Sequence, residues 1–290
     1  MTRIAVLGPG GVGGVMAARL QRAGHEVTVI ASERTAAIIA SGGLHYTLPD
    51  GSGVAAVTAR SLLAEPVGVL IVTTKAMDLL AAMRRVPVGL LGGTAVVPLL
   101  NGIDHVVFLR AELPGADVVA STISVEATRH RAGVVEQVSG FADVGVSLAS
   151  DGGRLWAQLA EDAGCTVTTV PDDATVLWRK LCFLAPLALL TTSTMAPVGE
   201  AVASRSDLVR PLVDEAAAAA GAAGVAIDAD VIEERLRSLP AGMQSSMLKD
   251  ALAGRAVELD AIAGPIIGAL GRDGARATVQ AVSGILAATA

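Results

Sequence analysis

The sequence is poor in aromatic residues and in cysteine, and both shortages restrict what the protein can be. Aromatic residues make up 2% of the 290 residues while hydrophobic residues make up 52%, so the core must be packed mainly from Ala, Val, Leu and Ile. The two cysteines, Cys165 and Cys182, have neither the spacing of a metal site nor the number needed for a disulfide framework. We interpret them as buried thiols of a cytoplasmic protein, kept in a reducing compartment.

Other absences exclude further classes of protein. The chain has 22 Lys and Arg against 28 Asp and Glu, and its net charge of −6 argues against a nucleic-acid-binding surface. The four histidines, His25, His45, His105 and His130, show no ligand spacing, so we expect no metal. No signal-peptide pattern precedes the first apolar strand, which follows Met1 almost directly.

Residues 181–198 are apolar enough to resemble a membrane span, but the stretch is not continuous. Pro186, Pro197 and the run from Thr191 to Thr194 interrupt it, and it falls short of the roughly 20 apolar residues that a bilayer requires. We therefore predict a buried helix and no membrane partner.

The first half of the chain alternates between short apolar strands and helices. We expect strands at residues 3–7, 26–30, 67–72, 95–100, 118–121 and 166–170, and helices at residues 12–23 and 33–40. Residues 44–48 and 54–57 flank a hairpin signal at Asp50-Gly51, and residues 134–146 predict a second antiparallel patch. The alternation predicts an α/β fold with a Rossmann-type, doubly wound sheet.

After residue 170 the sequence becomes rich in alanine and periodic like a helix. We therefore predict two domains. Residues 1–170 form a Rossmann-type domain, and residues 171–290 form an all-helical domain.

The segment from Gly8 to Gly13 fits the dinucleotide-binding pattern G-x-G-x-x-G and lies between a predicted strand and a predicted helix. In this pattern Gly8 allows a tight turn, Gly10 lets a pyrophosphate approach the backbone, and Gly13 permits close packing of strand and helix. The phosphates would contact N–H groups at the helix N-terminus, including those of Gly11 and Val12. A glycine turn in an unrelated α/β protein is the less favoured alternative.

The choice of cofactor depends on the end of the second strand, where NAD-binding domains usually carry an acidic residue for the ribose hydroxyls. Here Ser32 and Arg34 follow the strand and could hold a 2′-phosphate, whereas Glu33 between them argues for NAD. We predict NADP. The alternative is that Ser32 and Arg34 only cap and decorate a surface helix.

Five further polar residues are candidate site residues. Lys75 and Asn101 follow strands at the edge where open α/β sheets bind ligands, although a surface lysine and an Asn-Gly turn are the alternatives. Lys180 stands just before the apolar run, at a predicted helix N-terminus that disfavours a cation, and exposure to solvent is its alternative. Ser246 and Glu258 can serve one site only if the helix between them breaks, since a continuous helix would hold them roughly 18 Å apart. Gly254 is the predicted break.

Together these segments resemble the ketopantoate reductase (2-dehydropantoate 2-reductase) family over nearly the whole chain. Besides the glycine loop, the resemblance is carried by Gly24-His25-Glu26-Val27, Thr74-Lys75-Ala76, Asn101-Gly102, Trp178-Arg179-Lys180-Leu181, Ser245-Ser246-Met247-Leu248 with Asp250, and Gly254-Arg255 with Glu258-Leu259-Asp260. It implies that residues 1–170 bind NADP and that residues 171–290 form a substrate-binding and dimerisation domain like the C-terminal domain of 6-phosphogluconate dehydrogenase. It also implies that NADPH delivers hydride to the ketone carbon of a 2-keto acid, ketopantoate, in pantothenate biosynthesis.

The resemblance also implies roles for single residues. The lysine matching Lys180 protonates the developing alkoxide, and the glutamate matching Glu258 holds a substrate hydroxyl and helps to orient that lysine. The residues matching Asn101 and Ser246 bind substrate, and the one matching Lys75 lies beside cofactor and substrate. The chemistry agrees, because an ammonium in a dry site stabilises an oxyanion and can act as general acid.

The chain departs from the family pattern beside the proton donor. Leu184 and Ala188 share a helix stripe with Lys180 and stand where relatives commonly have substrate-binding asparagines. Met243 and Ser32 are further departures, at a position often polar in relatives and at one that is arginine in some of them. Thr191 or Thr192 is a candidate to restore one hydrogen bond.

Three interpretations follow. The first is NADPH-dependent reduction of ketopantoate, and the second is reduction of a different, more apolar 2-keto acid. The third is a non-catalytic NADP-binding or sensing protein, against which the presence of both Lys180 and Glu258 argues. The resemblance, together with the general frequency of two-fold assemblies, implies a homodimer through the helical domain.

Overall fold

The computed structural model describes residues 1–289, which fall into two compact units. The first unit contains residues 1–100 and 105–176, and the second contains residues 101–104 and the chain from Leu177 onward. Helix α6 (Asp173–Ser193) crosses the junction.

The first unit is built around a parallel sheet with the strand order β5-β2-β1-β6-β7-β8, which confirms the predicted Rossmann-type fold. Its strands are β1 (Arg3–Leu7), β2 (Glu26–Ile30), β5 (Thr58–Arg60), β6 (Val69–Val72), β7 (Ala95–Pro98) and β8 (Asp117–Val118). Every residue of β6 and β7 is buried, as expected for parallel strands that are covered on both faces.

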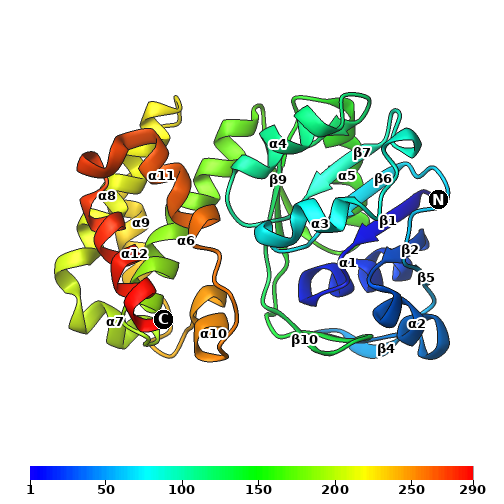
Figure 1. Ribbon diagram of the computed structural model, residues 1–290, viewed down its shortest axis with the longest axis horizontal. Helices are drawn as coiled ribbons and strands as arrows, with labels where there is room; N and C mark the ends of the chain where they lie inside the picture. Colours follow the sequence, from blue (N-terminus) through cyan, green and yellow to red (C-terminus); the bar gives the residue numbers. More distant parts are fainter. Residues whose placement is uncertain (290) are drawn as a thin grey trace. The chain divides into compact units, whose positions relative to one another are not determined.

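Helices alternate with these strands, and their starts set the position of the loops (Figure 1). β1 ends at Leu7 and α1 begins at Gly11, so the glycine loop lies at the carboxyl edge of the sheet. The helices and 3-10 turns of this unit are α1 (Gly11–Arg22), α2 (Glu33–Gly42), η1 (Ala76–Asp78), α3 (Leu79–Met83), η2 (Val88–Leu90), α4 (Asp104–Glu112) and α5 (Asp151–Asp162).

Two smaller sheets complete the first unit, with the orders β10-β11-β3-β4 and β13-β12-β9. Their strands are β3 (Leu44–Leu48), β4 (Gly51–Ala55), β9 (Ser121–Ser124), β10 (Ala127–Arg131), β11 (Val134–Gln137), β12 (Asp143–Ser147) and β13 (Thr166–Val170). The antiparallel hairpin predicted through Asp50-Gly51 is present as β3 and β4. The patch predicted at residues 134–146 is two strands of different sheets, since β11 pairs with β10 and β12 pairs with β9.

From Leu177 to residue 289 every element that the structure describes is a helix, which confirms the predicted helical C-terminal region. After α6 these are α7 (Val198–Ser204), α8 (Ser206–Ala222), α9 (Ala229–Arg237), α10 (Ser246–Leu252), α11 (Leu259–Gly274) and α12 (Arg276–Thr289). The alanines of α8 allow close packing, because Ala216 is fully buried and its carbonyl accepts a hydrogen bond from Cys182 Sγ at 3.2 Å. Glu215 ties α8 to α12 by accepting hydrogen bonds from the N–H groups of Ala277 and Thr278 at 2.7 and 2.8 Å.

Helix α6 begins earlier than the apolar run suggests. Asp172 accepts a hydrogen bond from the N–H of Thr175 at 2.8 Å, and the helix starts at Asp173. Lys180 therefore lies about two turns inside the helix, and the expected penalty for a cation at the helix N-terminus does not apply. By length and composition α6 could cross a membrane, but 67% of its apolar window is buried inside the protein, as in the core helix of a globular unit.

Candidate active site

The glycine loop is shaped by its contacts with the end of β6. Gly8 has φ +88°, a left-handed conformation that favours glycine. A Cβ atom on Gly13 would lie 2.2 Å from Thr73 Oγ1, so only glycine lets α1 approach the strands this closely. The Thr73 hydroxyl contacts the carbonyl oxygens of Leu7 and Gly8 at 3.1 and 2.8 Å and fixes the loop between two strands. Sequence reasoning missed Thr73, although its position at the end of a strand was a usable signal.

Gly10 and Gly11 are glycine for different reasons. A Cβ on Gly11 would lie 2.4 Å from the carbonyl oxygen of Ala127 in β10, so packing alone excludes a side chain there. A Cβ on Gly10 would meet nothing closer than the carbonyl of Gly8 at 3.9 Å. Gly10 is also the N-cap of α1 and offers no side chain to the N–H groups of the first turn. This open, donor-rich backbone fits a dinucleotide pyrophosphate.

The residues after β2 lie where the sequence predicts the adenosine end of the cofactor. Ser32 is the N-cap of α2, and its hydroxyl accepts a hydrogen bond from the N–H of Thr35 at 3.3 Å. Arg34 is exposed in the first turn. The Glu33 carboxylate is paired with Arg85 at 3.0 Å. Lys75 belongs to the same unit, as the N-cap of η1 beyond β6.

Asn101 follows β7 in the chain but packs with the helical unit. Gly102 beside it has φ +85°, and a Cβ there would lie 2.5 Å from the carbonyl oxygen of Ala261 in α11. The Asn-Gly turn is therefore pressed against the first turns of α11. This contact explains why residues 101–104 are grouped with the second unit.

Three predicted site residues meet in the helical unit. Lys180 Nζ on α6 donates a hydrogen bond to Asn101 Oδ1 at 3.2 Å, and Asn101 Nδ2 donates to Glu258 Oε2 at 3.2 Å. Glu258 is the residue before α11, and Gly254, with φ +65°, separates it from α10 as predicted. The amide of Asn101 thus links the two charged groups, because its oxygen accepts from the ammonium and its nitrogen donates to the carboxylate.

The electrostatics of this cluster tune the lysine. Burial lowers the pKa of Lys180 from 10.5 to about 8, and the negative charge of Glu258 opposes that shift. An ammonium with a pKa near neutrality is a better general acid than an ordinary lysine, because its proton is held less tightly while the protonated form still prevails at pH 7. The cluster can therefore stabilise a developing oxyanion and give it a proton.

Ser246 is the first residue of α10 and is exposed to solvent. Its neighbour Ser245 is buried instead, where it caps α10 through the N–H of Leu248 and contacts Thr191 Oγ1 at 2.8 Å. Thr191 also donates to the carbonyl of Leu187 at 2.7 Å, so its one hydroxyl proton is already used, and Thr192 is buried as well.

The apolar stripe expected beside Lys180 is present on α6. Leu184, one turn beyond Lys180, is partly exposed, and Ala188 is buried. Phe183 adjoins this stripe and carries the Arg235 guanidinium over its ring, at 4.1 Å from the centroid. Leu184 and Ala188 themselves offer no hydrogen-bonding side chain.

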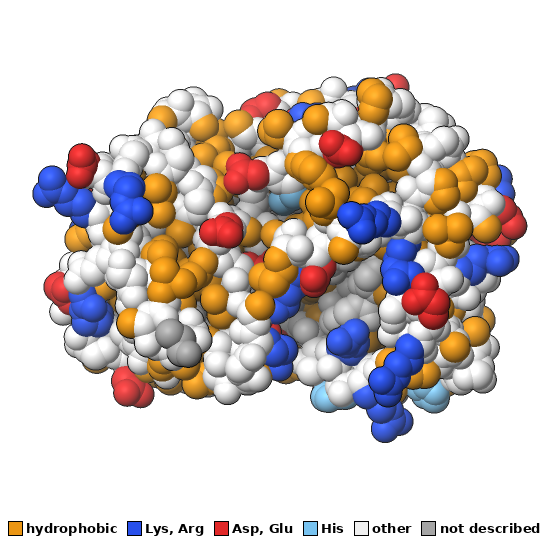
Figure 2. All heavy atoms as spheres, viewed as in Figure 1, with side chains coloured by type: hydrophobic (Ala, Val, Ile, Leu, Met, Phe, Trp, Pro, Cys, Tyr) orange, Lys and Arg blue, Asp and Glu red, His pale blue; other side chains and the backbone are white. Residues whose placement is uncertain are grey.

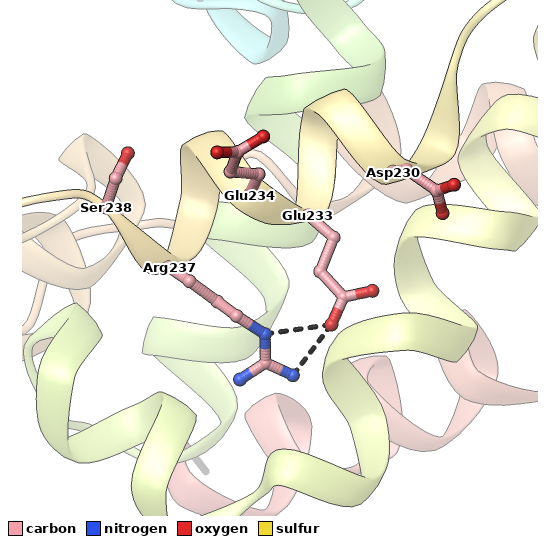
Figure 3. A pocket seen from close by; sticks show the side chains of 5 residues that line it. All are labelled: Asp230, Glu233, Glu234, Arg237 and Ser238. Atoms are coloured by element: carbon pink, nitrogen blue, oxygen red, sulfur yellow. Dashed lines mark hydrogen bonds and ion pairs between the residues drawn. The ribbon is translucent and has the colours of Figure 1, made fainter.

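A separate hollow of about 490 Å³ lies on α9 and is lined by Asp230, Glu233, Glu234, Arg237 and Ser238 (Figure 3). Three of its charged residues form ion pairs, since Arg237 contacts Glu233 at 2.7 Å and Asp230 contacts Arg210 at 2.5 Å. Exposed ion pairs of this kind are common on helical surfaces, and we assign them no chemistry.

Comparison with known proteins bears on the whole chain. Residues 4–147 match the family model "Ketopantoate reductase PanE/ApbA", and residues 174–282 match its C-terminal model. A 2-dehydropantoate 2-reductase from Mycobacterium tuberculosis is 32% identical over 273 residues, covering 92% of this chain and 90% of that protein.

Two solved structures share the fold. A PanE/ApbA family ketopantoate reductase from Ralstonia eutropha JMP134 superposes with a TM-score of 0.89 at 24% identity, covering 99% of this chain and 98% of that one. D-mandelate dehydrogenase, solved with NADH and anilino(oxo)acetate, gives a TM-score of 0.87 at 22% identity with the same coverage.

Proposed function

Since this chain belongs to the ketopantoate reductase family of oxidoreductases, we propose that it uses NADPH to reduce 2-dehydropantoate (ketopantoate) to pantoate, a step of pantothenate and coenzyme A biosynthesis. The observation that carries the proposal is the hydrogen-bonded cluster of Lys180, Asn101 and Glu258. A lysine that only reached into solvent would not be linked through an amide to a carboxylate, as Lys180 is linked through Asn101 to Glu258.

In this proposal the first unit holds the cofactor. The pyrophosphate lies on the backbone of Gly8, Gly10, Gly11, Val12 and Gly13, where Gly10 leaves open space. Ser32 and Arg34 face the 2′-phosphate, and Lys75 and Asn101 serve cofactor and substrate together. Bound NADPH supplies the hydride for the ketone carbon.

The helical unit supplies the proton. The Lys180 ammonium donates a hydrogen bond to the ketone oxygen and transfers its proton as negative charge develops there. Glu258 keeps the ammonium charged between turnovers and accepts a hydrogen bond from the substrate hydroxyl. Asn101 fixes the lysine and the glutamate in one arrangement, and Ser246 contacts the substrate.

A second candidate substrate is a 2-keto acid with an apolar side chain, because Leu184 and Ala188 offer no hydrogen bond. The two candidates differ by one hydroxyl. The decisive experiment compares kcat/KM for 2-dehydropantoate with that for 3,3-dimethyl-2-oxobutanoate, which has the same skeleton without the hydroxyl, using NADPH.

A clear preference for 2-dehydropantoate supports the first substrate, and the reverse preference supports the second. In the second case Leu184→Asn should move the preference towards the hydroxylated acid. A protein that binds NADPH and turns over neither acid, nor an aromatic 2-keto acid, would be the binding or sensing protein.

The same proposal includes a cytoplasmic enzyme that assembles as a homodimer through its helical unit. Leu252 on α10 and Leu286 on α12 are 54% and 56% exposed, and an apolar contact would cover them. Light scattering on the purified protein gives the oligomeric state, and Leu252→Glu and Leu286→Glu test these positions.

A further inference from the structure

An acidic residue, Glu33, follows β2, but its carboxylate is ion-paired with an arginine. Glu33 begins α2, close to where an acid would accept hydrogen bonds from ribose hydroxyls. Its Oε1 atom instead accepts a hydrogen bond from Arg85 Nη1 at 3.0 Å. The same Nη1 donates to the carbonyl oxygen of Ser61 at 3.1 Å. Arg85 is therefore held between α2 and the residue that follows β5.

Two more arginines belong to this corner of the sheet. Arg34 follows Glu33 in the first turn of α2 and is exposed. Arg60 is the last residue of β5, lies in register with Ile30 at the end of β2, and is exposed. Its carbonyl accepts a hydrogen bond from the N–H of Ala31 at 3.1 Å. In the view of Figure 2, Lys and Arg side chains are spread over the surface together with Asp and Glu side chains.

We propose that Arg85 and Arg60, with Arg34, determine selectivity for a dinucleotide with a 2′-phosphate, and that Arg85 does so partly by holding Glu33 away from it. The inference rests on the proposed use of NADPH and adds which residues create that preference. Ser32, already used as the N-cap of α2, plays only a minor part.

The charges explain the effect. Three guanidinium groups and one carboxylate leave two positive charges, which match a phosphate monoester of about −1.5 to −2. The hydrogen bond from Arg85 also lowers the pKa of Glu33, so that carboxylate stays ionised and would repel the phosphate if it were released. Planar guanidinium groups suit phosphate oxygens because they donate two parallel hydrogen bonds.

The test is equilibrium binding without substrate, so that it does not depend on turnover. Dissociation constants for NADPH and NADH are measured by calorimetry with the wild-type chain and with R85A, R60A and E33Q/R85A. The control is R22A, since Arg22 forms an exposed pair with Asp50 at 2.8 Å in the same unit and also loses one positive charge. Thermal unfolding shows that each variant is folded.

We expect R85A and R60A each to weaken NADPH binding by about tenfold or more while changing NADH binding by less than about threefold. In E33Q/R85A part of the lost NADPH affinity should return, because the released carboxylate is gone. R22A should change both constants by similar, small factors.

Two results would overturn the inference, and they differ in their meaning for the proposed function. A wild-type chain that binds NADPH more tightly than NADH, and keeps that ratio in both R85A and R60A, overturns the role of these arginines and leaves the use of NADPH intact. A wild-type chain that prefers NADH overturns both.

Discussion

Replacing Glu258 with glutamine should move the pH dependence of the reduction to lower pH. The change removes the negative charge that raises the pKa of Lys180, while the glutamine carbonyl can still accept the hydrogen bond from Asn101 Nδ2. The geometry of the cluster is kept and the electrostatics change, so the variant isolates one cause.

The expected size follows from the two hydrogen bonds. Two hydrogen bonds of 3.2 Å and the amide group between them separate the two charges, for which we take a distance of roughly 7 Å. At an effective dielectric constant of about 20 their attraction is about 2 kcal/mol, or between about one and two pKa units. Because only the ammonium can give a proton, the rate should fall above about pH 8 in the wild type, where the pKa of Lys180 lies. In E258Q the fall should begin between about pH 6 and pH 7.

The assay is the profile of kcat/KM against pH with NADPH and the preferred 2-keto acid. The readout is the pH at which kcat/KM begins to fall on the alkaline side of the profile, the alkaline limb. The absolute value of kcat/KM is not used, since it also reflects the lost contact between residue 258 and the substrate. Glu234→Gln is the control, because Glu234 is an exposed glutamate on α9 of the same unit. An alkaline limb that stays in place in E258Q, or moves to higher pH, would refute the electrostatic role of Glu258.

Three further predictions concern other parts of the structure. Gly10→Ala should weaken NADPH binding by at least about tenfold with little change in stability, whereas Gly11→Ala should lower the free energy of unfolding, because its Cβ would lie 2.4 Å from a carbonyl oxygen; calorimetry and urea unfolding distinguish them. Asn101→Ala should reduce kcat/KM by about a hundredfold and also shift the alkaline limb, since the link between lysine and glutamate is lost; a change in KM alone would contradict this role. Glu215→Ala should destabilise the chain by about 1–3 kcal/mol in urea unfolding, because two N–H groups of α12 lose their acceptor, and an unchanged midpoint would show that water replaces it.

Local patterns were sufficient to predict much of the fold. The buried strands, the glycine loop, the hairpin at Asp50-Gly51 and the helix break at Gly254 each follow from residues that are neighbours in sequence. Turn chemistry and hydrophobic periodicity act over such short distances, so they can be read without tertiary information.

Features that depend on distant contacts were not predictable in the same way. Asn101 follows β7 as expected, but the contact of Gly102 with Ala261, which makes residues 101–104 part of the helical unit, joins residues far apart in the sequence. The pairing of Glu33 with Arg85 joins residues 52 positions apart. Because of this pairing, Glu33 no longer argues for NAD as it did in the sequence. The strand expected at residues 118–121 divides between two sheets, which local propensity does not reveal.

The most direct test of the central claim is the rate of NADPH oxidation by the purified chain and by Lys180→Ala, with 2-dehydropantoate and with 3,3-dimethyl-2-oxobutanoate. We predict stoichiometric formation of the 2-hydroxy acid by the wild type and a loss of about 10²- to 10⁴-fold in kcat for the variant, with NADPH binding retained. A Lys180→Ala variant that keeps the wild-type rate on every substrate that the wild type accepts would contradict the assignment of Lys180 as the proton donor.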